Sequence, residues 1–477
     1  MASPGDYGRS LSTEIPFIVT SNIERADPAT RKLIRSHVMR GKRSKKALSH
    51  KARDASSMGA ITGRINAARV ELGEVAEIYQ AVAPSHFGSD VSFLTLADSI
   101  EPSALLSLTK VSPIATKIIS PLIAAIGYQP EKQGWLHIIG SDAAALHISV
   151  FAVEEFIEKV LRRHMYTENL TSMLHFQKGL EILQERLSGP DDQIKISDST
   201  IGVVVKLATA AHFNGDYRTS KQHMEAIRKM VDLRGGITAL KGKSMFTEIL
   251  KCDIAIALLN ASMPFIFSQS SEPVIPYPQK LLPASDTILD AHNNDEPFQD
   301  VDSGLATAWR VMKNFCFLVN LGAEVQRPIR LEIIHETMTA VMYRLLKKAF
   351  PFGSTNETLR QGLLAFSYHV FVQWQDIKSP YHEFRFTFKN CIESLKPESA
   401  ASSQMMLWLL MTGALAVFDL SDETWVGEYW HESARRCQVE TWNEVKIILK
   451  SFMWVALIDD EPGKRIYDTF NLRRGQI

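Results

Sequence analysis

Apolar residues recur at intervals of three and four positions through most of this chain. Such spacing places apolar side chains on one face of a helix, so it predicts helices that pack against one another. The pattern is clearest in Thr219–Gly236, where Met224, Ile227 and Val231 share a face and Met230 lies beside them. This stretch is expected to be the centre of a helical core.

The Thr219–Gly236 helix has recognisable ends. Thr219 or Ser220 is expected to cap its start, because a hydroxyl accepts a hydrogen bond from an otherwise unpaired backbone N–H. Gly235 and Gly236 are expected to end it, since glycine enters the left-handed conformation without a Cβ clash. Arg234 in the last turn suits the negative end of the helix dipole.

A helix is expected on each side of this one, at Asp198–Phe213 with Ser197 as its cap, and at Phe246–Leu259. The connection Phe213–Tyr217 is short enough to make the first two helices antiparallel neighbours. This arrangement is helical packing and carries no chemistry by itself.

The rest of the chain reads as helix after helix, without runs of alternating strand residues. Between Pro84 and Tyr128, apolar helices are expected to alternate with turns at Pro84, Gly88, Pro102 and Pro113. A proline-rich stretch at 268–304 shows no helical period and is expected to be a linker or long loop. Further helices are expected at about 141–163, 170–187, 306–320, 328–348, 357–375, 403–420 and 441–458.

The predicted fold is therefore all-α: a large multi-helix bundle or solenoid-like stack. A basic, largely disordered N-terminal arm is expected at 1–57. The helical domain is expected in two halves, 58–267 and 305–477, on either side of the linker at 268–304.

Several segments carry a family resemblance. The run H-x3-I-x2-M-V-D-L-R-G-G, His223 to Gly236, precedes an apolar helix that contains Asp253, and together they resemble the middle homology region of fungal-specific transcription factors. The segments DSTIGVVVKLATAA, GSDAAALHISVF and WNEVKIILKSFMWVALIDDEPGK are also similar, so the likeness covers roughly Ser85–Gly463. It implies a helical regulatory or dimerising body in which the following motif positions are structural: Met230, Arg234, Gly235, Gly236 and Asp253.

The chain departs from this family in one respect. Members usually carry a six-cysteine binuclear zinc cluster ahead of the regulatory region, whereas Cys252, Cys316, Cys391 and Cys437 stand far apart and form no C-x2-C pair. They are expected to be buried free thiols in a reducing compartment. No metal site and no cofactor is expected.

Charge is segregated along the chain. Residues 1–57 hold 12 Lys and Arg against 5 Asp and Glu, while the remainder holds 41 against 48. No acid occurs from Ala29 to Arg53, and the segment IRSHVMRGKRSKKA resembles an N-terminal segment of fungal proteins that have the regulatory region without zinc ligands. The candidate DNA-contact or nuclear-localisation residues are Arg31, Lys32, Arg35, Arg40, Lys42, Arg43, Lys45 and Lys46.

Three roles remain open for this arm: a nuclear-import address, contact with DNA phosphates, or simple solubility. A basic zipper is a weaker interpretation. Ile61, Ile65, Ala68 and Leu72 begin a seam with intervals of four and three, but glycines interrupt that helix and the basic run holds no asparagine to read bases.

Membrane and secretory segments are not expected. The N-terminus lacks the apolar core of a signal peptide. Ser399–Phe418 is uncharged, but its apolar centre, Met405–Phe418, is shorter than the ~20 residues that a bilayer core requires. It is predicted to be a buried helix.

Catalytic motifs are absent from the sequence. There is no H-E-x-x-H, G-x-S-x-G, G-x-G-x-x-G or Walker lysine loop. The histidines lie at spacings, such as that between His164 and His175, that do not share a helix face, so satisfied core or surface histidines are expected. Adjacent carboxylates, such as Glu154 and Glu155, point to different faces of a helix. The chain is not expected to be an enzyme.

The expected function is that of a nuclear, transcription-regulator-like protein without its own zinc cluster. Protein partners are expected, as a dimer or a co-regulator, and DNA is a possible partner through the arm; no membrane partner is expected and no small-molecule effector can be named. A helical protein-interaction scaffold that never touches DNA is the alternative. An enzyme with a site assembled from dispersed residues is a third hypothesis.

Overall fold

The computed structural model describes residues 96–128, 140–162, 169–267, 274–282, 301–375, 377–378, 381–396, 399–420 and 424–474. All of them belong to one compact unit, Ala67–Ile477. The part of the chain so described is all-α, as the sequence predicts.

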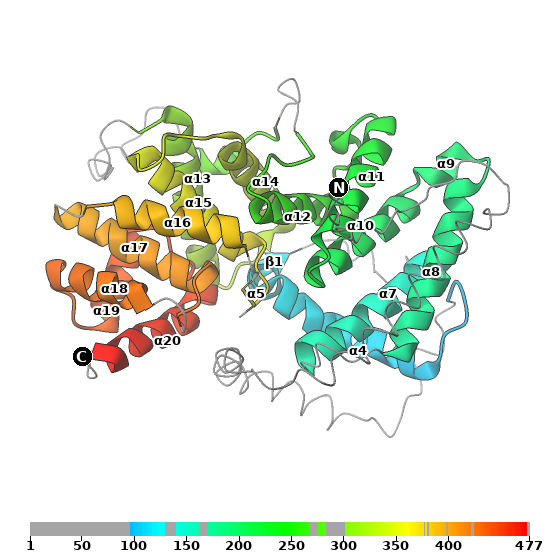
Figure 1. Cartoon of the computed structure of the whole chain (residues 1–477), viewed down its shortest axis with the longest axis horizontal. Coiled ribbons are helices and arrows are strands. Elements are labelled where there is room, and N and C mark those ends of the chain that lie inside the picture. The colour runs from blue at the N-terminus through cyan, green and yellow to red at the C-terminus, as the bar shows by residue number, and fades with distance from the viewer. Residues whose placement is uncertain are drawn as a thin grey trace, which may run out of the picture. The chain divides into compact units, whose positions relative to one another are not determined.

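The described elements before the proline-rich stretch are mostly helices (Figure 1). They are α4 (Pro102–Ile119), α5 (Pro121–Ile126), β1 (Gly127–Tyr128), α7 (Ala143–Phe156), the π-helical turn η2 (Ile157–Leu161), α8 (Leu170–Ser188), α9 (Asp192–Lys195), α10 (Asp198–Phe213), α11 (Tyr217–Leu233), the 3₁₀ turn η3 (Ile237–Leu240) and α12 (Ser244–Leu259).

The described elements from the proline-rich stretch onward continue the same architecture. They are the 3₁₀ turn η4 (Gln279–Leu281), α13 (Ser303–Glu324), β2 (Ile329–Arg330), α14 (Leu331–Lys347), α15 (Thr355–Phe371), α16 (His382–Ser394), α17 (Ala400–Ala416), α18 (Thr424–Arg436), α19 (Trp442–Phe452) and α20 (Ala456–Arg474). The two short strands pair in parallel, Gly127 with Ile329 and Tyr128 with Arg330.

Helices pack in pairs: α7 against α8, α10 against α11, and α15 against α17 (Figure 1). The short connection between α10 and α11 makes these two antiparallel neighbours, as the sequence predicts. One hydrophobic core runs from Leu122 on α5 to Phe470 on α20. Helices on both sides of the proline-rich stretch therefore bury their apolar faces in a common core.

The helix of Met224, Ile227 and Val231 is α11, and all three side chains are buried. Its start differs from the prediction. Asp216 is the cap and accepts a hydrogen bond from the backbone N–H of Thr219, so neither Thr219 nor Ser220 caps the helix. Asp216 caps the helix in preference to these hydroxyls because its carboxylate accepts a charge-assisted hydrogen bond from the exposed N–H group.

The uncharged stretch around Met405–Phe418 forms α17, whose side chains from Met405 to Ala416 are all buried. This confirms the predicted buried helix. Within the described residues, no helix has both the length and the apolar character needed to cross a bilayer.

Two predicted boundaries are wrong. The turn expected at Pro113 is absent, because α4 continues through it while Val111 and Ile118 hold the helix against a local apolar cluster. The single helix expected at 441–458 is two helices, α19 and α20, separated by Met453–Val455.

Tertiary hydrogen bonds explain this second break. Asn320 on α13 donates its side-chain amide to the Trp454 carbonyl at 2.8 Å and accepts from the Ala456 N–H at 2.9 Å. Asp459 accepts from the Val455 N–H at 2.6 Å. These partners replace the intrahelical bonds that a continuous helix would make.

Candidate functional site

The basic residues Arg31 to Lys46 lie outside the described residues, as does the zipper-like seam that begins at Ile61. Their roles stay predictions. Within the described residues, the candidate positions are the motif residues and the polar clusters of the helical body.

The two glycines of the motif end α11. Gly235 and Gly236 have φ angles of 91° and 94°. The Gly235 N–H donates to the Asp232 carbonyl at 3.0 Å, and the Gly236 N–H to the Val231 carbonyl at 2.9 Å. This is the paired-bond glycine cap that satisfies the last carbonyls of a helix.

Arg234 connects this cap to α10. Its guanidinium donates to the Ile196 carbonyl at 3.3 Å and pairs with the Asp198 carboxylate, which also binds Lys243. Met230 lies half-buried against the core. Both residues therefore take part in packing α11 onto its neighbours.

Asp253 on α12 lies apart from Arg234 and makes a separate junction. Its carboxylate is fully buried and accepts three hydrogen bonds: from the N–H groups of Phe265 (2.7 Å) and Ile266 (2.9 Å), and from the hydroxyl of Tyr343 on α14 (2.8 Å). Burial raises the pKa of Asp253 to about 6, although the three donors favour the ionised form. The junction ties the loop after α12 to α14.

A polar cluster that the sequence did not reveal lies where α7 and α8 meet. The Nδ1 atoms of His147 on α7 and His175 on α8 are 2.7 Å apart, and their rings stack with centroids 5.0 Å apart. The Nε2 atom of His147 lies 3.2 Å from the Asp98 carboxylate, and that of His175 lies 3.1 Å from the Glu101 carboxylate. A carboxylate thus flanks each outer end of the histidine pair.

The histidines are buried while their carboxylates reach solvent. His147 and His175 expose 6% and 7% of their side chains, whereas Asp98 and Glu101 expose 37% and 63%. The cluster borders an open pocket of about 270 Å³, which Thr171, Leu174 and Lys178 of α8 also line.

The pKa values at this cluster follow from its geometry. Burial lowers the pKa of His147, although the hydrogen bond to Asp98 acts in the other direction. The backbone N–H of Ser99 and the imidazole of His147 lower the pKa of Asp98. The backbone N–H of Glu101 and the imidazole of His175 lower the pKa of Glu101. Both carboxylates are therefore ionised at neutral pH.

Sequence reasoning missed this pair because it compared histidines along single helices. His147 and His175 are 28 positions apart, and only the α7–α8 hairpin brings them together. The sequence offered one signal for a buried polar contact: each histidine lies next to the apolar stripe of its own helix. Within the described residues, no group of three or more His, Cys, Asp or Glu is placed to hold a metal ion.

A second buried cluster surrounds a much smaller cavity of about 10 Å³, enough for about one water molecule. Lys251 donates to the Ser120 hydroxyl at 3.0 Å, and burial lowers its pKa to about 8. Thr247 bonds to Nδ1 of His335 at 2.9 Å, while Nε2 of His335 is buried without a protein partner. This cavity is too small for a substrate.

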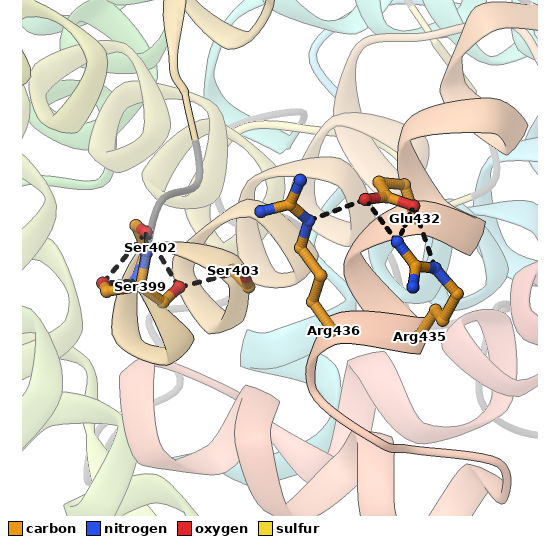
Figure 2. A network of polar contacts seen from close by, with 6 residues as sticks. All are labelled: Ser399, Ser402, Ser403, Glu432, Arg435 and Arg436. Atoms are coloured by element: carbon orange, nitrogen blue, oxygen red, sulfur yellow. Dashed lines mark hydrogen bonds and ion pairs between the residues drawn. The ribbon is translucent and has the colours of Figure 1, made fainter.

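A surface network near the start of α17 is local in character (Figure 2). The Ser399 and Ser402 side chains cap the helix reciprocally, and Ser403 donates to the Ser399 carbonyl at 2.9 Å. On α18, Arg435 and Arg436 both donate to Glu432, at 2.9 and 2.7 Å. Such exposed ion pairs contribute little stability, because solvent screens them.

Comparisons of the chain with family models, with curated proteins and with solved structures find no match.

Proposed function

We propose that this protein is a transcription-regulator-like protein that lacks a zinc cluster. Its helical body would be the regulatory or dimerising part, and its basic arm would direct nuclear import and grip DNA weakly without sequence choice. Base-specific recognition would come from a protein partner. The observation that carries this proposal is charge segregation: ten bases and no acid from Ala29 to Arg53, against a body with a net negative charge.

The described body supports a role in packing and regulation. The motif residues that the family resemblance singles out, among them Arg234 and Asp253, join helices to one another. The order of the motifs along the chain adds to the proposal, because it resembles that in the regulatory region of fungal-specific transcription factors.

A salt-dependent gel shift tests the DNA contact. Arg43, Lys45 and Lys46 would be replaced by glutamine in the full chain. The control replaces three exposed bases of α11, Arg218, Lys221 and Lys229, and so removes the same charge from the body. The arm variant is expected to weaken binding and to reduce the slope of log K against log salt by about 2.7, since each phosphate contact contributes about 0.9.

The location of a fluorescent fusion tests nuclear import with the same two variants. The arm variant is expected to leave the nucleus and the α11 variant to stay. A fusion whose location ignores the arm, together with no retardation of DNA at low salt, would contradict the proposal.

The alternative function, a protein-interaction scaffold without DNA contact, has one observation in its favour. Phe317 and Leu321 on α13 and Val325 at its C-cap recur at intervals of four and expose 68%, 42% and 53% of their surface. An exposed apolar row of this kind is typical of a surface that meets another protein. Self-association or partner binding that survives the arm substitutions, in a protein that does not retard DNA, would favour the scaffold.

A further inference from the structure

We propose that His147 and His175 share a single proton and so act as a pH-dependent latch, which fixes the segment Leu96–Glu101 onto the α7–α8 hairpin. The latch is the chain of hydrogen bonds Asp98–His147–His175–Glu101. This inference does not rest on the proposed function.

Counting protons defines the closed state of the latch. Asp98 and Glu101 are ionised, so they only accept, and each Nε2 atom must carry a proton to donate to its carboxylate. The two Nδ1 atoms, 2.7 Å apart, form a hydrogen bond only if one of them carries a proton. Three protons on four nitrogens therefore satisfy every bond, with one imidazole neutral and one charged.

Either neighbouring protonation state breaks one bond of the chain. With two protons, both on Nε2, the two Nδ1 atoms present lone pairs to each other at hydrogen-bond distance; moving one of these protons to Nδ1 would restore the central bond and break a bond to a carboxylate. With four protons, two N–H groups face each other and two positive charges stack with ring centroids 5.0 Å apart. The closed state is therefore populated over an intermediate range of pH. Above and below that range, a hydrogen bond of the chain is lost.

The charges that face the pair favour this window. Asp98 and Glu101 stabilise one positive charge from the segment side. Lys178 on α8 and the charge of His175 both oppose a positive charge on His147, in addition to burial. His147 is therefore the neutral member of the pair.

The latch acts on a segment with modest packing of its own. Leu96 and Ile100 are only partly buried against Ala104, Leu108 and Leu146. The polar chain is the part of this attachment that responds to pH.

Amide hydrogen exchange of residues 96–101 in the full chain tests the proposal. Exchange would be followed from pH 4.5 to 9 in EDTA, corrected for the intrinsic pH dependence and compared with amides of α17. Protection is expected to be highest at an intermediate pH and to fall about five-fold on the alkaline side, the effect of one lost hydrogen bond. It is expected to fall again toward pH 4.5.

The double variant H147Q/H175Q separates the shared proton from simple packing. Glutamine amides can donate to Asp98 and Glu101 but do not titrate, so protection is expected to lose its pH dependence. The control H382Q changes an exposed histidine on α16 and is expected to keep the wild-type profile.

Three results would overturn the proposal. One is a protection of the wild-type amides 96–101 that stays flat or rises from pH 6 to 9. This result does not depend on whether any variant folds. Another is a double variant that retains the wild-type profile. The third is protection that appears only when Zn²⁺ is added, which would place a metal ion between the Nδ1 atoms in place of the proton.

Discussion

The imidazole of His369 on α15 lies 2.8 Å from the carboxylate of Asp459 on α20; Asp459 is fully buried and His369 exposes 12% of its side chain. The amide nitrogen of Gln373 donates to the carbonyls of Ile377 and Leu415, so its oxygen is left to accept from Nδ1 of His369. Both ring nitrogens then donate, and His369 is an imidazolium.

This pair predicts a pH dependence of stability. Burial lowers the pKa of His369, but the hydrogen bond and charge of Asp459 outweigh burial and leave that pKa above its ordinary value. The stabilisation is therefore complete below about pH 6.5, the pKa of the unfolded chain, and is lost as pH rises through the folded pKa. Urea unfolding between pH 6 and 9 should show this decline.

Asp459→Asn is the variant for that prediction. It is expected to remove the decline and to destabilise the protein by about 3 kcal/mol, because it leaves a buried imidazole without its charged partner. Asp468→Asn, at an exposed ion pair of the same helix, is the control and should keep the decline. An unchanged pH profile in Asp459→Asn would refute the imidazolium assignment.

Asp253→Ala is expected to cost about 3–5 kcal/mol of the free energy of unfolding. It leaves the N–H groups of Phe265 and Ile266 and the hydroxyl of Tyr343 without their acceptor. Asp232→Asn is the control, since Asp232 is half exposed and pairs with Arg228 at the surface, where the loss is under about 1 kcal/mol. Equal losses in chemical denaturation of the two variants would contradict the junction described for Asp253.

Gly235→Ala and Gly202→Ala are expected to act in opposite directions. At Gly235 the φ of 91° disfavours any Cβ, so alanine should lower the melting temperature and cost about 1–2 kcal/mol. Gly202 lies inside α10 with open space around an added Cβ, so alanine should stabilise by about 0.5–1 kcal/mol. Thermal unfolding measures both, and a stabilising Gly235→Ala would exclude the cap at the end of α11.

The cysteines are expected to react unequally with a thiol reagent. Burial raises the pKa of Cys252 to about 12 and that of Cys391 to about 11, and it also raises those of Cys316 and Cys437. Cys437 alone of the four is only half-buried. The native protein should therefore show one accessible thiol and the denatured protein four.

Cys437→Ser should abolish the reaction of the native protein, whereas Cys391→Ser should leave it unchanged. Rapid modification of two or more thiols in the native state would contradict the burial of Cys252, Cys316 and Cys391.

Local sequence signals predicted the helices well and their joints less well. α10 begins at Asp198 with Ser197 as its cap, as expected, because both the cap and the apolar period lie within a few residues of each other. The gap at Met453–Val455 could not be predicted, because Asn320 on a distant helix supplies the bonds that compensate for it.

The histidine cluster was harder to predict from the sequence than the helices. His147 and Asp98 are 49 positions apart, and Glu101 and His175 are 74 apart. No periodicity within one helix relates them. Their meeting depends on how α4, α7 and α8 pack, which is set by apolar contacts such as those of Leu108 and Leu146.

The parallel pairing of Gly127 with Ile329 has a consequence for biosynthesis. The two residues are separated by about 200 positions, and one short ladder joins them across all the helices between. During translation, β1 cannot pair until the ribosome has synthesised β2. The backbone N–H and C=O groups of β1 therefore stay without their strand partner for many seconds at ordinary elongation rates. A nascent chain arrested before Ile329 should therefore engage chaperones that a chain arrested after α14 no longer needs.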